Sequence, residues 1–169
     1  KARYGLMLRE DGIVMDDGTT TRISENHYHM TTTTAQAANV LSHLEYYLQI
    51  VWPELNVNVV STTEQWAGAA IAGPKSRDML SKLYPDLDVS NEALPFMGYK
   101  EAEFFGVPSR IFRISFSGEL AYEINVKSDH GMFMWEKMME VGKEFGNQPY
   151  GTEALSTLRI EMGHVAGPE

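Results

Sequence analysis

The chain of 169 residues is 43% hydrophobic and 22% charged, carries a net charge of −9 and contains no cysteine. This length and composition are typical of one globular domain, or of one domain and part of another. The negative charge argues against nucleic-acid binding, which needs Lys and Arg to neutralise phosphates. The lack of cysteine excludes disulfides and fits a reducing, cytoplasmic setting. No apolar run is long enough for a membrane span, and no secretory signal is visible.

The first part of the chain is predicted to form short strands and then a helix. Asp-Gly and Glu-Asn turn signals separate four strand-like runs, at residues 4–8, 13–15, 19–23 and 27–32. Apolar residues recur at intervals of three and four over residues 34–49, which predicts a helix. Val57 and Val59 flank Asn58, and this alternation predicts another short strand.

The rest of the chain alternates strands and helices. A strand over residues 68–72 is followed by Gly73-Pro74, a typical helix start. Further strands are expected at 102–105, 107–114 and 121–126, and further helices at 128–141 and 152–162. In the first of these two helices, Met132, Trp135, Met138 and Met139 are expected to face inward. Hairpins together with helical crossovers predict an α+β fold with mixed or antiparallel sheets and packed helices.

Two acid-bearing segments interrupt strand-like runs at a glycine. In Gly12–Gly18, Asp16 and Asp17 precede the glycine. Adjacent strand residues point to opposite faces, so at most one of these carboxylates faces a given pocket. Composition alone favours an Asp-Gly turn that joins two strands. The functional alternative is that one carboxylate holds an amine or ring nitrogen by a charge-assisted bond.

The second acid-bearing segment is Ser117-Gly118-Glu119. By itself Glu119 is a turn acid, but one carboxylate also accepts two neighbouring N–H groups at once. Glu123 follows four residues later and either supports Glu119 or faces solvent.

The last predicted helix carries a charge on an apolar stripe. Arg159 falls among Leu155, Leu158 and Met162, and a buried charge there requires a partner. The structural interpretation is an ion pair with Glu161 or another acid, and the functional one is ligand contact. His27 and His29 share a strand face, but no further ligand lies at a familiar spacing, so we predict no metal site.

In this order, Gly12–Gly18, Ile114–Glu123 and Tyr150–His164 resemble the folate-binding domain of the glycine-cleavage T-protein (aminomethyltransferase) family. The sarcosine oxidase α-subunit branch of this family is the most similar. The resemblance extends over nearly all 169 residues. It implies that residues 1–169 are the central part of a T-protein-like folate-binding domain, truncated at both ends and belonging to a longer chain.

The resemblance also assigns residues by position. Asp17 matches the family aspartate beside the reactive nitrogens of tetrahydrofolate and is the expected catalytic residue. Glu119 matches the glutamate that holds the pterin ring. His29 takes the place of a tyrosine near folate, where it lines the pocket or relays a proton near neutral pH. Arg159 completes the expected folate-binding set. Leu155 replaces a folate-contacting arginine of the T-proteins, which disfavours glycine cleavage and agrees with the sarcosine oxidase branch.

The implied function is capture of the one-carbon unit from oxidised N-methylglycine by tetrahydrofolate, which yields 5,10-methylenetetrahydrofolate. Flavin and NAD are expected elsewhere in the complex, other sarcosine oxidase subunits are the expected partners, and the fragment alone is expected to be inactive. The alternatives are a glycine-cleavage aminomethyltransferase, a related folate-dependent demethylase, and a non-catalytic interaction module of the same fold. Neither nucleic acid nor a membrane is an expected partner.

Overall fold

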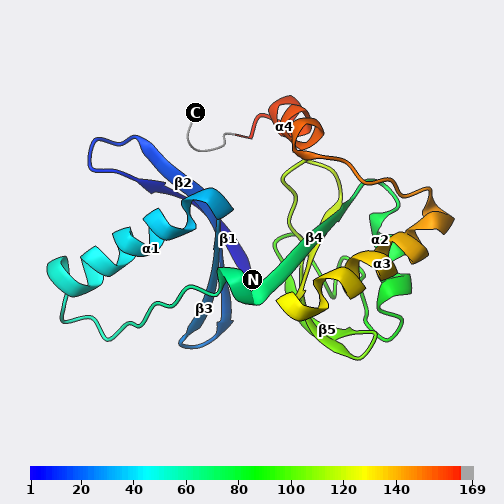
Figure 1. Cartoon of the computed structure of the whole chain (residues 1–169), viewed down its shortest axis with the longest axis horizontal. Coiled ribbons are helices and arrows are strands. Elements are labelled where there is room, and N and C mark those ends of the chain that lie inside the picture. Colours follow the sequence, from blue (N-terminus) through cyan, green and yellow to red (C-terminus); the bar gives the residue numbers. More distant parts are fainter. Residues whose placement is uncertain (165–169) are drawn as a thin grey trace. The chain divides into compact units, whose positions relative to one another are not determined.

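The computed structural model describes residues 1–164 and divides them into two compact units (Figure 1). The amino-terminal unit contains residues 3–64, and the carboxy-terminal unit contains residues 1–2 and 65–164. Both units combine a sheet with helices, and antiparallel pairs occur in each, β2–β3 in one and β4–β7, β7–β6 and β6–β5 in the other, which confirms the predicted α+β class. Among the described helices, none has the length and apolarity needed to cross a membrane.

The amino-terminal unit is built on a three-stranded sheet in the order β1-β2-β3. Its strands are β1 (Ala2–Leu8), β2 (Val14–Ser24) and β3 (His27–Thr32). A 3₁₀ turn, Thr34–Gln36, leads into α1 (Ala37–Tyr46), which continues as a π-helical turn, Tyr47–Val51.

The predicted strand around Val57 and Val59 is wrong. Residues 56–62 belong to no strand. The local backbone bonds run from the Leu55 N–H to the Trp52 carbonyl and from the Val57 N–H to the Leu55 carbonyl. Alternating valines favour an extended chain, but a strand also needs a neighbour to pair with, and the described residues supply none here.

The carboxy-terminal unit contains a four-stranded sheet in the order β4-β7-β6-β5, with every neighbouring pair antiparallel. The strands are β4 (Trp66–Ala72), β5 (Tyr99–Phe104), β6 (Val107–Phe112) and β7 (Ala121–Lys127). The helices are α2 (Ser76–Leu83), α3 (Gly131–Gly142) and α4 (Thr152–Glu161).

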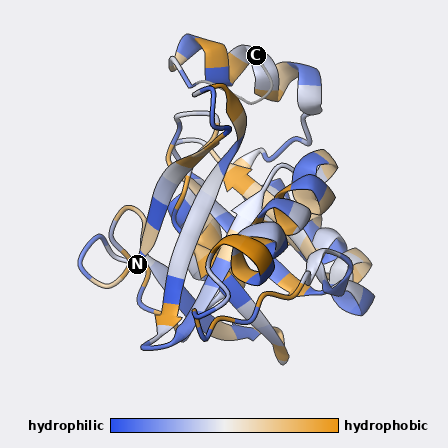
Figure 2. Ribbon diagram, turned by 90° about the vertical axis from the view of Figure 1, so that its left-hand side faces the viewer, coloured by the Kyte–Doolittle hydropathy of each residue, from blue (hydrophilic) through white to orange (hydrophobic). Residues whose placement is uncertain are grey.

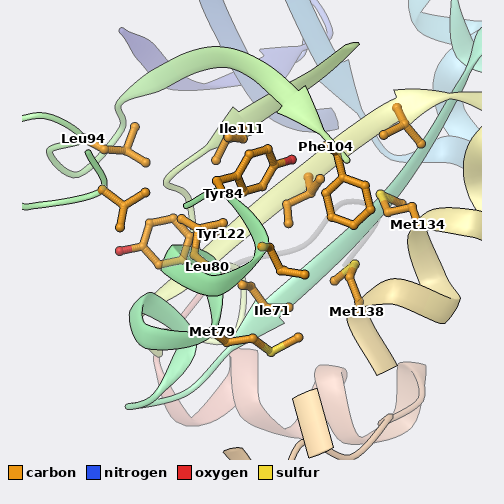
Figure 3. Close-up of a cluster of buried hydrophobic side chains, with 14 residues drawn as sticks. Ile71, Met79, Leu80, Tyr84, Leu94, Phe104, Ile111, Tyr122, Met134 and Met138 are labelled. Carbon is orange, nitrogen blue, oxygen red and sulfur yellow. The ribbon is translucent and has the colours of Figure 1, made fainter. Parts of the chain in front are cut away.

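A cluster of buried apolar side chains connects the four strands with α2 and α3 (Figure 3). Within β7, Tyr122, Ile124 and Val126 belong to this core, so Glu123 and Asn125 lie on the opposite face of the sheet. Figure 2 shows hydrophobic and hydrophilic residues interspersed along the helical ribbons.

The inward face of α3 agrees only in part with the prediction. Met138 is buried as predicted, and Met134 is buried as well, whereas Met132 and Trp135 are 70% and 45% exposed. Several stripes of this methionine-rich helix have helical spacing. Periodicity alone therefore does not decide which of them faces the core.

Candidate functional site

Asp16 and Asp17 lie inside β2, which continues through both of them. The predicted Asp-Gly turn is therefore wrong. A Cβ atom on Gly18 would lie 1.9 Å from the carbonyl oxygen of Thr31 in β3. The glycine at this position allows two strands to approach closely and does not reverse the chain.

The two aspartates have different surroundings. Asp16 is fully buried, and its Oδ2 accepts a hydrogen bond from the Thr33 N–H at 3.0 Å. Asp17 is half-buried, and its Oδ2 accepts a hydrogen bond from the Tyr4 hydroxyl at 3.0 Å. Strand alternation places the two carboxylates on opposite faces. Asp16 ties β2 to the end of β3, whereas Asp17 remains accessible to a ligand.

Tyr4 is a functional candidate that the motif analysis missed. Burial raises the pKa of its hydroxyl, and the hydrogen bond to Asp17 and the charge of Asp17 raise it further. The hydroxyl therefore stays protonated and donates to the carboxylate. The sequence does show a tyrosine in the first predicted strand, one strand before the aspartates. Only the fold shows that its hydroxyl contacts Asp17.

The face of the sheet that carries Asp17 also carries a row of hydroxyl groups. Thr19 and Thr21 follow Asp17 at alternate positions of β2 and therefore share its face. The Thr19 and Thr31 Oγ1 atoms lie 2.7 Å apart. Thr21 pairs directly with His29 of β3, so His29 lies on this face as well.

The strand register also limits what Asp17 and His29 can do together. Asp17 is four residues from Thr21, the partner of His29, which corresponds to about 13 Å along the strand. The two side chains are too far apart for direct proton transfer, but one elongated ligand can contact both. Among residues 1–164, no group of three His, Asp or Glu side chains is arranged to hold a metal ion.

Glu119 lies in the loop between β6 and β7 of the carboxy-terminal unit and is exposed. The loop is seated against the end of α4. Gly118 has a φ of +82°, and a Cβ atom on it would lie 1.9 Å from Met162 Cγ. The rings of Phe116 and His164 stack with centroids 6.1 Å apart and an interplanar angle of 15°. These contacts fix the course of the loop that presents Glu119.

The sequence left two alternatives for Glu123, support of Glu119 or exposure to solvent. In the structure Glu123 is half-buried on β7. It lies on the sheet face opposite the core, and burial raises the pKa of its carboxyl group. Glu123 is therefore not fully solvated, and its burial favours the neutral carboxyl group.

Arg159 is buried in α4, as its place on the apolar stripe predicts. Its Nη1 donates to the backbone carbonyl of His164 at 3.0 Å. Within the described residues, no ion pair joins Arg159 to Glu161. The visible contact is structural and closes the end of α4 against which the Glu119 loop rests.

The four predicted site residues form two pairs. Asp17 and His29 share a sheet face in the amino-terminal unit, and Glu119 and Arg159 lie around the β6–β7 loop and α4 in the other unit. A hollow of about 660 Å³ beside β4 contains none of the four. Small residues of β4 line it together with residues of α3 and α4.

Residues 1–167 match the model of the family described as the GCVT N-terminal domain. The chain belongs to this family. That membership confirms the resemblance to the T-proteins, since aminomethyltransferases are among the relatives. The chain is 32% identical over 164 residues to the aminomethyltransferase of Chloroherpeton thalassium, covering 97% of this chain and 43% of the relative.

Two other relatives of this GCVT-family chain have a higher sequence identity than the aminomethyltransferase, and both are named sarcosine oxidase subunit alpha. The chain is 54% identical over 171 residues to the sarcosine oxidase subunit alpha of Rhizobium meliloti, a match that covers all of this chain. It is 51% identical over 165 residues to the protein of the same name from Corynebacterium sp. strain P-1, which covers 97% of this chain. The chain spans 17% of the length of each relative.

Proposed function

We propose that this chain is the tetrahydrofolate-binding part of a sarcosine oxidase α subunit, and the central part of a longer folate-binding domain. In this proposal it captures the one-carbon unit from oxidised N-methylglycine as 5,10-methylenetetrahydrofolate, in a complex with the other subunits. The observation that carries the proposal is the accessible carboxylate of Asp17, held by Tyr4 on a sheet face lined with hydroxyl groups. The identity of 54% with a sarcosine oxidase α subunit supports it.

The side chains present suit such a ligand. A reduced pterin presents amino and ring N–H groups side by side, and these need acceptors. On the β2–β3 sheet, Asp17 supplies carboxylate oxygens and the Thr19–Thr31 pair adds hydroxyl oxygens. The resemblance to the T-proteins assigns a second carboxylate, that of Glu119, to the pterin ring. Carboxylates are strong acceptors for paired N–H donors, so this set fits the ligand chemically.

The proposed mechanism relies on positioning and proton handling. Tetrahydrofolate, when bound, supplies the amine nitrogens that take up the one-carbon unit. The Tyr4 hydroxyl holds Asp17 Oδ2, which leaves Oδ1 to accept the amine N–H and take its proton. Glu119 anchors the pterin ring and so holds the amine nitrogens in position for the one-carbon unit. Such positioning raises the rate of the capture step.

Binding is tested with Glu119→Gln in the full-length polypeptide. This change keeps the size of the side chain but removes its charge and one acceptor. Affinity for tetrahydrofolate should therefore fall by about 1.5–3 kcal/mol, the range for hydrogen bonds to charged groups. Glu136→Gln, at an exposed position of α3, is the matched control and should bind normally. Unchanged affinity of Glu119→Gln in calorimetry would contradict the proposed role.

A second candidate is a folate-dependent aminomethyltransferase or demethylase, which the 32% identity with an aminomethyltransferase favours. A panel of one-carbon donors, including N-methylglycine, distinguishes the two activities. If the full-length polypeptide binds no tetrahydrofolate, both are contradicted in favour of a non-catalytic module.

A further inference from the structure

Two arginines of the carboxy-terminal unit converge on one side-chain amide. Arg77 lies in α2, and Arg113 directly follows β6. Asn91 Oδ1 accepts hydrogen bonds from Arg77 Nη2 at 2.7 Å and from Arg113 Nη1 at 2.9 Å. Two guanidinium groups therefore share a single neutral acceptor.

Their other visible partners are also neutral. Arg77 Nη1 donates to the Val89 carbonyl, and Arg113 Nη1 donates to the Leu94 carbonyl at 3.0 Å. Within the described residues, neither arginine forms an ion pair with a carboxylate. Two positive charges this close repel each other, and carbonyl dipoles offset only part of that repulsion. An anion between them would relieve it.

A buried hydroxyl group lies beside the same two charges. Phe112 pairs with Glu123, and Arg113 and Tyr122 are the residues next to this last pair of the β6–β7 ladder. The Arg77 guanidinium carbon lies 5.9 Å from the centroid of the Tyr122 ring. Burial raises the pKa of the Tyr122 hydroxyl, while the charges of Arg77 and Arg113 act to lower it.

Both groups retain hydrogen-bonding capacity. Tyr122 is fully buried, and among the described residues neither its hydroxyl nor Arg113 Nε has a hydrogen-bond partner. Figure 3 shows the Tyr122 hydroxyl at the outer side of the core cluster, on the side of Leu94. Buried donors without partners are uncommon, and here they lie next to uncompensated positive charge.

We propose that Arg77, Arg113 and Tyr122 form a binding site for a small oxyanion, a carboxylate or a phosphate group. Arginine suits such a ligand because its planar fork of N–H groups matches the spacing of two oxyanion oxygens. The Tyr122 hydroxyl adds a third donor, and Asn91 holds the two forks together. None of its residues is among the four predicted folate-binding residues, and the test below uses no folate.

The test is thermal unfolding of the full-length polypeptide in sodium phosphate, sodium acetate or sodium chloride at equal ionic strength. A saturable rise in Tm with phosphate or acetate, beyond that in chloride, is the expected result. A rise with phosphate alone assigns the site to phosphate groups, and a rise with acetate assigns it to carboxylates. If neither anion exceeds chloride, the proposal is wrong.

Asn91→Asp sharpens this test because it places a carboxylate within reach of both arginines. The variant should have a higher Tm than the wild type in chloride and should lose the rise caused by the anion. Asn58→Asp makes the same charge change in the other unit and should keep the rise. Arg110→Met, which removes an arginine 3.7 Å from its own partner Glu101, should keep it as well. An undiminished rise in Asn91→Asp would overturn the assignment.

Discussion

The two units share a pattern of secondary structure, but only one of them builds a large core. In each, three successive strands form neighbours in a sheet and lead through a 3₁₀ turn into a helix: β1-β2-β3 and α1 in one, β5-β6-β7 and α3 in the other. The carboxy-terminal unit adds β4 and α2 before its three strands, and β4 pairs with the third strand, β7. The described residues of the amino-terminal unit include no such addition.

The effect of the added strand and helix is a difference in burial between corresponding residues of β3 and β7. Counted from the two 3₁₀ turns, Tyr28 and Met30 of β3 take the places of Tyr122 and Ile124 of β7. Tyr122 and Ile124 are fully buried, whereas Tyr28 and Met30 are 56% and 38% exposed. Three strands and one helix thus leave the apolar side of the third strand open. A further strand and helix bury it.

The largest expected effect comes from truncating this pair of positions. Ile124→Ala should destabilise the carboxy-terminal unit by about 2–5 kcal/mol, because it leaves a cavity in the core. Met30→Ala, at an exposed position, should cost about 0.5 kcal/mol or less. Denaturant unfolding of the full-length polypeptide measures both. An equal cost for Met30→Ala would mean that other parts of the longer polypeptide bury this face, and the contrast between the units would fail.

A smaller effect is expected at the two glycines of the acid-bearing segments. Alanine at Gly18 meets the backbone of Thr31, which cannot move away without opening β2 from β3, so we expect a loss of about 1–3 kcal/mol. Alanine at Gly118 meets the flexible side chain of Met162 and costs mainly the strain of its positive φ, about 1 kcal/mol. Gly5→Ala, with open space around its Cβ, is the control.

Hydrogen exchange reports these glycine substitutions separately. Gly18→Ala should increase exchange in β3, whereas Gly118→Ala should increase it in the β6–β7 loop. Equal protection of β3 in Gly18→Ala and Gly5→Ala would show that the close approach of the strands is not important for stability.

Sequence periodicity predicted most elements of both units, because the spacing of apolar residues is a local property. It did not predict that β2 continues through Asp16, Asp17 and Gly18. The reason for the glycine lies in another strand, where Thr31 approaches it. The bond between Tyr4 and Asp17 is likewise non-local, since the two residues are thirteen positions apart along the chain. Local patterns identify such residues but do not show which of them meet.

The smallest expected effect concerns the face opposite the core, where Glu123 of β7 corresponds to His29 of β3. Burial raises the pKa of Glu123, so the folded state favours its neutral form. Stability from this residue is present at low pH and is lost as the pH rises from the ordinary glutamate range through the raised value.

Glu123→Gln should therefore be more stable than the wild type at neutral pH and similar to it in acid. Tm measured against pH for both proteins tests this, with the exposed Glu136→Gln as control. A variant that is less stable at neutral pH would show that the ionised carboxylate has a favourable partner in the full-length polypeptide.

The proposed function and the role of Asp17 in it are tested most directly by incubating the full-length polypeptide with N-methylglycine and tetrahydrofolate and measuring the products. In Asp17→Asn, peroxide production should continue, free formaldehyde should accumulate, and the capture step should slow by about 100- to 10,000-fold, as is typical for loss of a general acid or base. Asp16→Asn should mainly lower stability, because Asp16 is buried and bonded to the backbone of Thr33. An equal shift of products in both variants, or a shift in Asp16→Asn alone, would contradict the account.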